Sequence, residues 1–256
     1  TKYHNLKSDY FDSRKIISIK KSTTNNIIVD FEKTKRKLNE KLKNSSAELI
    51  IMPGFIASDS ENNVTTLGRG GSDFTASIIC SLLSGKKLDI WTDVSGMYTA
   101  NPKIVKQAKP IQKLSYEEAM ELSYFGAKVI YPPTIQPLIS KKIPINIKNT
   151  FKPRDEGSVI GIKSNNKFSA IKGISHIEDI SLITLEGSGM IGIPGYSKRL
   201  FECLSRGNVN IVMITQASSE HSICIGIKSS DEKNASLIIN DEFESEILNK
   251  VINPII

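Results

Sequence analysis

The pattern of apolar and polar positions in residues 47–91 predicts a strand, a helix and a second strand. Residues 47–55 form an apolar run closed by Pro-Gly, which is typical of a buried strand that ends in a loop. Residues 74–83 carry apolar side chains at helical spacing, and residues 87–91 form another apolar run. This order predicts a parallel α/β sheet, with ligands bound beyond the carboxyl ends of its strands.

The pattern predicts further elements on both sides of this region. Two weak strand candidates, residues 16–19 and 26–29, are followed by an amphipathic helix over residues 30–42. The helix positions expected to face a core are Phe31, Leu38 and Leu42. Later, Ser115 and Glu118 have the spacing of a capping box at a helix start. Residues 143–148 predict a strand in which Pro144 marks an edge or the first position.

The last third of the chain has a compact pattern of its own. Its expected elements are a strand at 180–186, a helix at 195–206, strands at 209–215 and 221–227, a helix at 231–247 and room for a last strand at 250–256. The order βαββα is typical of a ferredoxin-like α+β domain. Turn-forming residues at 150–166 predict a domain boundary, which we place between a first domain at 1–160 and a second at 161–256.

The stretch from Leu67 to Asp73 predicts an anion-binding turn before a helix. Its glycines precede the helix N-terminus, where Ser72 or Asp73 is the expected N-cap, and Arg69 adds a planar fork for a carboxylate or phosphate. Glycines before a helix also serve simple tight turns. The stretch matches neither the phosphate loop of nucleotide-binding proteins nor the dinucleotide fingerprint.

A second polar loop follows the strand at 87–91. Asp93 is either a turn residue or a contact to a nucleotide, for which Tyr98 offers a ring and a hydroxyl. Both polar loops follow strands, so they are expected at one face of the sheet. Lys128 follows Gly126, where a helix is expected to break, and is either solvated or directed into a cleft.

Composition excludes several classes of protein. Lys and Arg outnumber Asp and Glu by 34 to 27, giving a net charge of +7, but no basic stripe interleaved with aromatic residues indicates nucleic-acid binding. No apolar run reaches the length of a membrane span and no signal-like segment is present, which predicts a cytoplasmic protein. The three cysteines lie far apart in apolar segments, and the histidines lack ligand spacing, so no protein-held metal is expected.

Several motifs in a fixed order resemble the aspartokinase branch of the amino-acid kinases. They are Gly68–Asp73, the Trp91-Thr92-Asp93 loop through Tyr98, and residues 125–129. Residues 172–175 and 214–220 are similar to the first ACT domain of aspartokinases that are fused to a homoserine dehydrogenase and inhibited by threonine. This resemblance implies an αβα sandwich of the amino-acid kinase type, followed by a ferredoxin-like ACT domain.

The resemblance also implies roles for individual residues. Arg69 would bind a substrate carboxylate, and Asp73 would orient the charged groups as the catalytic residue. The pocket for aspartate would be lined by Gly70, Gly71 and Ser72. The implied ATP-binding residues are Thr92, Asp93, Tyr98, Lys103, Lys128 and Val129, with Lys103 at a position where many relatives have arginine. Ile214 and Gln216 would contact threonine, although Gln216 also suits an exposed strand end.

The implied reaction is transfer of the γ-phosphoryl group of MgATP to the side-chain carboxylate of L-aspartate, giving 4-phospho-L-aspartate. A carboxylate is already ionised at pH 7, so positioning and neutralising charges would carry the catalysis. NADP(H) would serve only a dehydrogenase part outside this chain, and oligomers would form through the ACT domains. The family's early Lys-Phe-Gly-Gly-Thr-Ser segment is absent here, so we expect an internal fragment that is not a competent kinase by itself.

Two other functions remain open from the sequence. The chain could be a non-catalytic ACT-type amino-acid sensor, or it could belong to a monofunctional aspartokinase that is lysine-sensitive or serves the methionine branch. The Thr215-Gln216 pair favours the threonine-sensitive enzymes.

Overall fold

A computed structural model of the chain forms two compact units, Thr1–His176 and Ile177–Ile256. It describes residues 4–20, 27–124, 129–163, 171–216 and 220–255. The boundary expected between residues 160 and 161 falls inside strand β10 (Ser158–Gly161) and stays a prediction.

Unit 1 combines short strands with four helices in its described residues. Before the glycine-rich stretch lie β1 (Ser8–Tyr10), a 3-10 turn (Ser13–Lys15), β2 (Ile19–Lys20), β3 (Ile28–Val29), α1 (Phe31–Lys43), β4 (Leu49–Ile51), β5 (Ile56–Ser58) and β6 (Val64–Thr66). After it lie α2 (Gly71–Leu82), β7 (Leu88–Thr92), β8 (Lys113–Ser115), α3 (Tyr116–Tyr124), α4 (Pro132–Ile139), β9 (Ile145–Asn149) and β10. The largest sheet has the order β7-β9-β10-β8.

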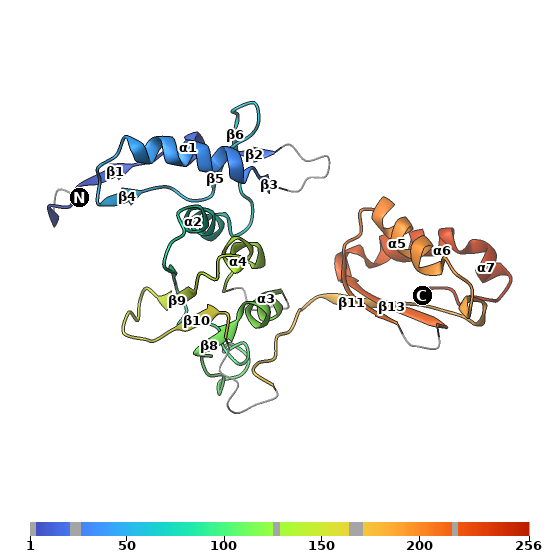
Figure 1. Cartoon of the computed structure of the whole chain (residues 1–256). Helices are drawn as coiled ribbons and strands as arrows, with labels where there is room; N and C mark the ends of the chain where they lie inside the picture. Colours follow the sequence, from blue (N-terminus) through green and yellow to red (C-terminus); the bar gives the residue numbers. More distant parts are fainter. Residues whose placement is uncertain (1–3, 21–26, 125–128, 164–170, 217–219, 256) are drawn as a thin grey trace. The chain divides into compact units, whose positions relative to one another are not determined.

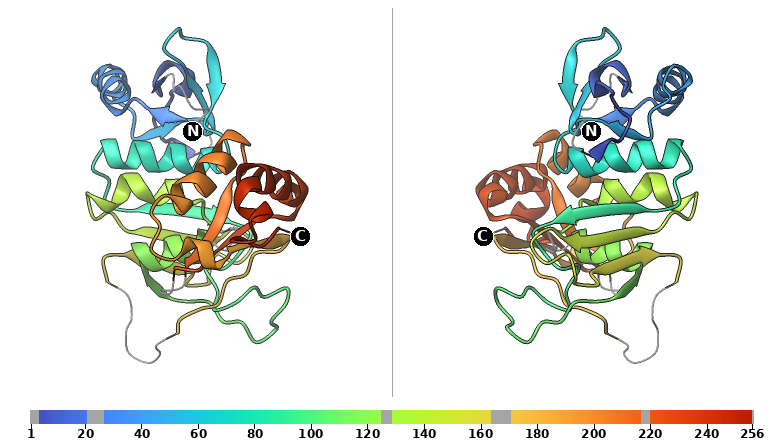
Figure 2. Two further views of the ribbon diagram at one scale, coloured as in Figure 1. Left: turned by 90° about the vertical axis from the view of Figure 1, so that its right-hand side faces the viewer. Right: turned by 90° about the vertical axis from the view of Figure 1, so that its left-hand side faces the viewer.

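Helix α2 lies at the centre of unit 1. Figures 1 and 2 show α2 and α4 side by side, between the N-terminal strands and the four-stranded sheet. Ile78 of α2 belongs to a buried cluster with N-terminal side chains such as Phe11, Ile17 and Leu38. Ala76 and Cys80, also on α2, pack against the second cluster, formed by the sheet, α3 and α4. Helix α2 therefore contributes side chains to two hydrophobic cores.

The sheets differ in detail from the expected parallel arrangement. β7 and β9 are parallel, but β10 is antiparallel to β9, so the four-stranded sheet is mixed. The strand expected at 47–55 ends at Ile51, and β4 pairs with β1 rather than with β7. A turn at residues 53–55 then leads into the β5–β6 hairpin. The chain reaches the glycine-rich stretch from this hairpin.

Side chains cap the starts of two helices. Asp30 caps α1 by accepting a hydrogen bond from the Lys33 N–H at 3.0 Å. The capping box of α3 is confirmed: the Ser115 N–H donates to Glu118 Oε2 at 2.8 Å, and the Glu118 N–H donates to Ser115 Oγ at 3.1 Å. The expectation that Phe31 faces a core is wrong, since its side chain is 38% exposed at the first helical position.

Helix α4 was not expected from the sequence pattern. Its sequence, Pro-Pro-Thr-Ile-Gln-Pro-Leu-Ile, contains three prolines. Two of them occupy the first turn, where a missing N–H costs nothing because those groups have no helical partner. Thr134, Ile135 and Leu138 are buried. Pro144 lies just before β9, which is an inner strand, so it marks a strand start rather than an edge.

Unit 2 has the expected βαββα order. Its elements are β11 (Ile180–Glu186), a 3-10 turn (Ser188–Met190), α5 (Tyr196–Arg206), β12 (Ile211–Gln216), β13 (Ser222–Lys228), a 3-10 turn (Ser229–Asp231), α6 (Glu232–Glu242) and α7 (Glu244–Leu248). The antiparallel sheet has the order β11-β13-β12. The helix expected at 231–247 is divided at Phe243, whose ring is fully buried.

The last strand expected at 250–256 is not formed by the described residues 250–255. The segment nevertheless lies beside the end of β11. The Asn253 N–H donates to the Glu186 carbonyl at 2.8 Å, and the Val251 carbonyl accepts from the Gly189 N–H at 3.0 Å. These isolated bonds hold the segment without a regular ladder.

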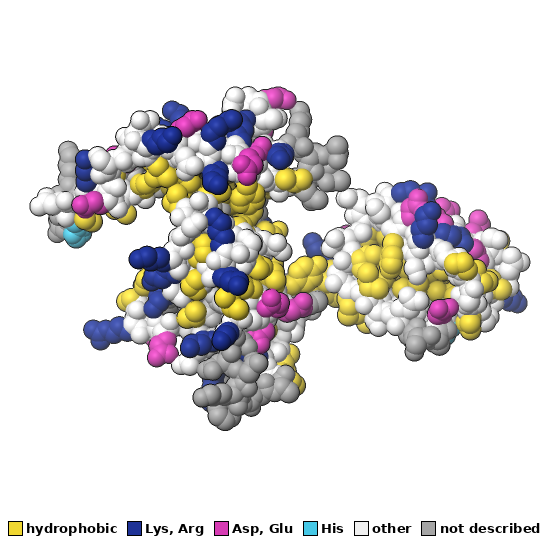
Figure 3. Space-filling view, viewed as in Figure 1, with side chains coloured by type: hydrophobic (Ala, Val, Ile, Leu, Met, Phe, Trp, Pro, Cys, Tyr) yellow, Lys and Arg dark blue, Asp and Glu magenta, His cyan; other side chains and the backbone are white. Residues whose placement is uncertain are grey.

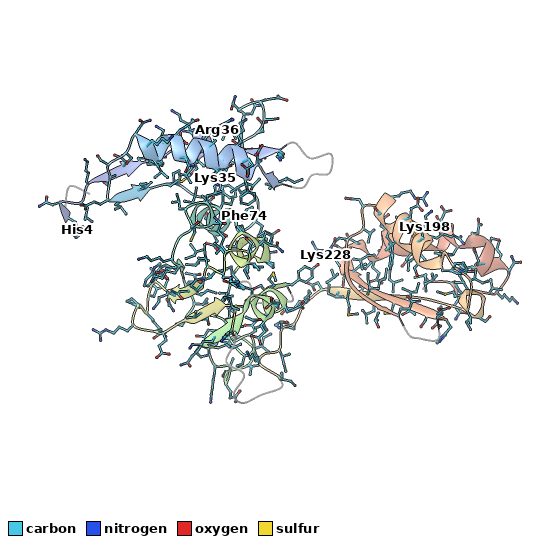
Figure 4. All side chains as sticks on the ribbon, viewed as in Figure 1. His4, Lys35, Arg36, Phe74, Lys198 and Lys228 are labelled. Atoms are coloured by element: carbon cyan, nitrogen blue, oxygen red, sulfur yellow. The ribbon has the colours of Figure 1, made fainter. Side chains whose placement is uncertain are left out.

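The charged side chains of both units are spread over many elements. Lys35 and Arg36 project from α1, and Lys198 and Lys228 lie on different elements of unit 2 (Figure 4). On the face shown in Figure 3, basic side chains lie among acidic and hydrophobic ones. No helix in the described part of the chain is long and apolar enough to cross a membrane.

An arginine cluster joins α5 to α6 and α7 in unit 2. Arg199 Nε lies 3.0 Å from Glu242 Oε1, and its Nη1 donates to Glu246 Oε1. Its guanidinium carbon lies 4.5 Å from the centre of the Phe243 ring. The second oxygen of Glu242 is 2.7 Å from Arg206 Nη2. Paired charges and the buried ring fix α5 against α6 and α7.

Replacing Glu246 with Gln tests this cluster. The hydrogen bond from Arg199 lowers the pKa of Glu246, so the pair stabilises unit 2 above the ordinary carboxyl pKa and stops doing so as pH falls through the lowered pKa. We expect Glu246→Gln to lower the free energy of unfolding by about 0.5–1 kcal/mol at pH 7, since the pair is partly screened by solvent. Urea titrations followed by circular dichroism should show this difference shrink as the pH falls below the ordinary carboxyl pKa and vanish below the lowered pKa of Glu246.

Glu244→Gln is the matched control. Glu244 is exposed on the same helix and forms no ion pair with another described residue. Equal destabilisation by the two substitutions, or a Glu246→Gln effect that persists in acid, would contradict a specific role for the Arg199 pair.

Candidate functional site

The residues predicted to bind the substrate line one cavity in unit 1. The cavity measures about 430 Å³ and is lined by Phe55 together with Gly68, Arg69, Gly70, Gly71, Ser72 and Asp73. It lies where the β5–β6 hairpin passes into α2. The predicted group is thus contiguous in space as well as in sequence, and it opens beside a helix N-terminus, where unpaired N–H groups favour an anion.

Glycine is required at the start of α2 because of its backbone conformation and its neighbours. Gly68 and Gly70 have φ values of +69° and +67°, in the left-handed region. A side chain at position 70 would also come within 2.5 Å of Tyr131 Cβ. The expected N-cap at Ser72 or Asp73 is wrong: Gly70 is the N-cap, and no side chain caps the helix. The Ser72 and Asp73 side chains are consequently not occupied by capping.

Phe55 is a lining residue that sequence reasoning missed. It has a φ of +75°, and its side chain is 42% exposed beside the cavity. The Pro53-Gly54 pair indicated a turn here, but nothing in the pattern indicated that the turn would return to the glycine-rich stretch. Tyr131, which packs on Gly70, was missed for the same reason, since 61 positions separate the two residues in sequence.

The cavity carries one cation and one anion. Arg69 is exposed, and Asp73 is half-buried. Burial raises the pKa of Asp73, and no hydrogen bond or charge from another described residue counters that rise. A carboxylate that is partly removed from water and lacks a cationic partner is an electrostatic site for a positively charged ligand group. Arg69 offers the complementary site for a carboxylate.

The second predicted loop leaves the sheet at the end of β7. Thr92 is the last residue of that strand, and its Oγ1 donates to Asp93 Oδ1 at 3.1 Å. Asp93 is exposed, and Tyr98 is partly buried and forms an isolated bridge to Pro110. Gly96, with a φ of +109°, passes so close to the start of β10 that a side chain would come within 2.3 Å of Ser158 Oγ.

Buried polar side chains fix the middle of this loop. Asn149 Nδ2 donates to Ser95 Oγ at 2.9 Å, and Ser95 in turn donates to Asp155. Ser158 Oγ accepts from the Met97 N–H at 2.8 Å. The loop is therefore held by groups on β9, β10 and the segment between them, none of which sequence reasoning had selected.

Three other residues were predicted to bind ATP, and the structure does not place the two that it describes in the lining of the substrate cavity. Lys103 is exposed in a turn in which its N–H donates to Asn101 Oδ1 at 3.0 Å. Val129 is partly buried and packs against the core of the sheet. Lys128 lies outside the described residues. Among the described residues, no hydrogen bond or ion pair links the cavity lining to the Thr92–Lys103 loop.

The segment that leads to unit 2 is anchored beside this loop. The Ile174 N–H donates to the Thr99 carbonyl at 2.8 Å. Lys172 Nζ lies 2.7 Å from Glu118 Oε1, and Lys172 is only 19% exposed. Glu118 therefore serves both its capping box and this ion pair.

The predicted effector residues lie on an edge strand of unit 2. Ile214 is opposite Ile225 and Gln216 is opposite Ile223 in the ladder between β12 and β13. Directly paired side chains share a face, so Ile214 and Gln216 lie on the same side of the sheet. Both are exposed, Ile214 by 56%. In the described part of the chain, no group of three or more His, Cys, Asp or Glu side chains could hold a metal ion.

Comparison with known sequences identifies two families within the chain. The model of the amino acid kinase family matches residues 3–149, and a model of the ACT domain matches residues 183–243. The bifunctional aspartokinase/homoserine dehydrogenase 1 (chloroplastic) of Arabidopsis thaliana is 38% identical over 247 residues, which cover 94% of this chain and 27% of that protein. The bifunctional enzyme of Haemophilus influenzae is 39% identical over 210 residues, covering 81% of this chain and 26% of that protein.

A relative whose name gives only an aspartokinase activity is also similar. The lysine-sensitive aspartokinase 3 of Escherichia coli is 36% identical over 177 residues, covering 69% of this chain and 39% of that protein. The chain thus spans about a quarter of the length of the bifunctional relatives and about two fifths of this one.

Solved structures agree with the sequence matches. E. coli aspartokinase III in complex with aspartate and ADP, in its R-state, superposes with a TM-score of 0.75 at 30% identity, covering 89% of this chain and 50% of that one. The aspartate kinase of Clostridium acetobutylicum gives a TM-score of 0.60 at 28% identity, covering 92% and 70%. The expected fold class and the resemblance to aspartokinases are confirmed. Because the kinase family model matches more than half of the 256 residues, the chain belongs to the amino acid kinase family and carries an ACT domain after the kinase part.

Proposed function

We propose that this chain is part of an aspartate kinase, and that the cavity at the start of α2 binds the acceptor, L-aspartate. The observation that carries the proposal is that Arg69 and a half-buried Asp73, which has no charged or hydrogen-bonded partner among the described residues, line one cavity of about 430 Å³. Similarity to a kinase structure solved with aspartate and ADP supports it. The activity belongs to a longer protein, since the relatives extend well beyond this chain.

The charges of the cavity match those of an amino acid. Arg69 forms charge-assisted hydrogen bonds to one carboxylate, while Gly70, Gly71 and Ser72 present backbone and hydroxyl groups around it. Asp73 faces the ammonium group, which returns the raised pKa of its carboxyl toward the ordinary value. An α-amino acid with an acidic side chain satisfies both charges and leaves a second carboxylate to react. A ligand with phosphates alone would leave Asp73 opposed to a negative charge.

The reaction transfers the γ-phosphoryl group of MgATP to the side-chain carboxylate of aspartate. A carboxylate oxygen forms the new bond to phosphorus as the bond to the ADP leaving oxygen breaks, giving 4-phospho-L-aspartate. The attacking carboxylate is already ionised at pH 7, so this chain contributes positioning by Arg69 and Asp73 rather than a base. Mg²⁺ enters with ATP and spreads the phosphate charge when it is bound.

ATP is assigned to the loop after β7. Thr92 and Asp93 provide polar groups at the carboxyl end of the strand, where α/β sheets bind ligands, and Tyr98 provides a ring and a hydroxyl. The resemblance to aspartokinases adds three further residues to the proposed ATP site, namely Lys103, Lys128 and Val129. The anchoring of this loop by Asn149 and Ser158 supports a preformed rather than a mobile nucleotide site.

Regulation is assigned to unit 2. Threonine is proposed as the effector, bound near Ile214 and Gln216, because the motif around Gln216 resembles that of threonine-sensitive aspartokinases. The similarity to the lysine-sensitive aspartokinase 3 makes lysine the competing effector. The same resemblance assigns homoserine dehydrogenase activity with NADP(H) to a part outside this chain, and oligomers to contacts between ACT domains.

Arg69→Ala tests the acceptor site in the protein expressed from its full reading frame. Losing a charge-assisted contact to the substrate carboxylate should raise KM for aspartate by about 10–100-fold while changing KM for ATP by less than about threefold. Formation of aspartyl hydroxamate with ATP measures both constants. Arg36→Ala, which removes an exposed arginine from α1, is the control and should change neither. Equal effects of Arg69→Ala on the two substrates would refute the assignment.

Gln216→Ala tests the effector site. We expect the threonine concentration for half inhibition to rise by about 5–30-fold, as for loss of a polar contact to a ligand, with uninhibited activity unchanged. Thr215→Ala is the matched control, because its side chain lies on the opposite face of β12. Titration of the same proteins with lysine distinguishes the two effectors. Normal threonine inhibition of Gln216→Ala would eliminate this site.

A further inference from the structure

We propose that Thr75 is a positioning residue for the acceptor cavity, holding the Phe55 turn against the first turn of α2. Thr75 is 4% exposed and lies outside the cavity lining, so it acts through Phe55 and Gly71, which do line it. The inference rests on the proposed function, because it assigns Thr75 an effect on aspartate binding.

The Thr75 hydroxyl connects both walls of the cavity. Thr75 Oγ1 lies 2.8 Å from the Gly71 carbonyl, and the Phe55 N–H lies 3.0 Å from the same oxygen. A carbonyl only accepts, so the hydroxyl proton points to Gly71 and a lone pair faces the Phe55 N–H. The hydroxyl is thus donor and acceptor at once. Neither valine nor alanine can replace it, whereas serine can.

The Phe55 turn needs such a bond because its conformation is unfavourable. Its φ of +75° is uncommon for a bulky residue and persists only where the surroundings determine it. Two hydrogen bonds hold Phe55 in this conformation. Its N–H donates to Thr75 Oγ1, and its carbonyl accepts from the Leu67 N–H at 2.8 Å. Without the Thr75 hydroxyl, the Phe55 N–H loses its partner and one of the two restraints disappears.

The contacts between the two turns leave no room for a side chain at either glycine. A side chain at Gly54 would come within 2.8 Å of Ser72 Cα, and one at Gly71 would come within 2.8 Å of Phe55 Cδ2. The turns therefore fit together directly, and a movement of Phe55 moves the cavity wall. The nucleotide loop shares no hydrogen bond with these residues in the described part of the chain, so the effect should be selective for the acceptor.

The same helix supplies a matched control. Ser77 is fully buried on α2, two positions after Thr75, and its Oγ has no hydrogen-bond partner among the described groups. Ser77→Ala therefore deletes a buried hydroxyl that holds nothing. Comparing Thr75→Val with Ser77→Ala separates the loss of these two bonds from a general disturbance of the helix.

The experiment uses the protein expressed from its full reading frame, as wild type, Thr75→Val, Thr75→Ser, Ser77→Ala and Arg69→Ala. Hydroxamate kinetics give kcat and both KM values, and calorimetric titration gives aspartate binding. Hydrogen–deuterium exchange of the peptide containing Phe55 reports the turn directly. We expect Thr75→Val to raise KM and Kd for aspartate by about 5–20-fold, with KM for ATP within about twofold of wild type, and to accelerate exchange at Phe55. Thr75→Ser and Ser77→Ala should stay near wild type.

The outcomes separate this inference from the proposed function. If Arg69→Ala raises KM for aspartate but Thr75→Val changes neither aspartate constant, Thr75 has no positioning role while the cavity assignment stands. Parallel rises in KM for aspartate and ATP would also overturn the inference, since they indicate general damage. Unchanged exchange at Phe55 would refute the proposal that the Thr75 hydrogen bond holds the Phe55 turn. A wild-type protein that neither binds nor phosphorylates aspartate would overturn both proposals.

Discussion

The direct contact between the Pro53–Phe55 turn and the first turn of α2 is the constraint on which the candidate site depends. Glycines at 54 and 71 allow the two backbones to meet, and the Thr75 hydroxyl bonds to both. This contact places Phe55 in the same cavity lining as Arg69 and Asp73, so that a residue with an uncommon backbone angle forms part of the candidate site. It also fixes the start of α2, and the packing of α2 in turn fixes both cores of unit 1.

Sequence reasoning found the part of the site that is contiguous in the chain. The glycines, Arg69 and Asp73 predicted an anion-binding turn, and all of them line the cavity. What it missed came from distant contacts. Phe55 and Tyr131 reach the turn from other elements, and no local pattern records such approaches. The N-cap was misassigned because a left-handed glycine can start a helix without a side-chain cap, whereas Ser72 and Asp73 have the usual capping chemistry.

Among the helices and strands, too, features determined by neighbouring residues were predicted correctly, and features determined by distant contacts were not. β11 and α5 agree closely with their expected ranges, and the capping box of α3 formed as expected, because neighbouring residues determine these features. The pairing of β4 with β1 and the mixed four-stranded sheet depend on which strands meet in space. Helix α4 was hidden by its three prolines, two of which lie in the first turn, where proline is tolerated. A last strand was expected after α7, with a full ladder of hydrogen bonds. The segment instead makes two isolated hydrogen bonds, one to β11 and one to the adjoining turn, so no strand forms there among the described residues.

Helix α2 lies between two hydrophobic clusters and so connects parts of unit 1 that belong to separate sheets. Ile78 faces the N-terminal cluster, while Ala76 and Cys80 face the cluster over the four-stranded sheet. Loss of the N-terminal strands and α1 would uncover one side of a helix that is apolar on both. A protease cut in the chain before α2 would then yield a C-terminal piece with an exposed apolar surface, which favours aggregation over independent folding.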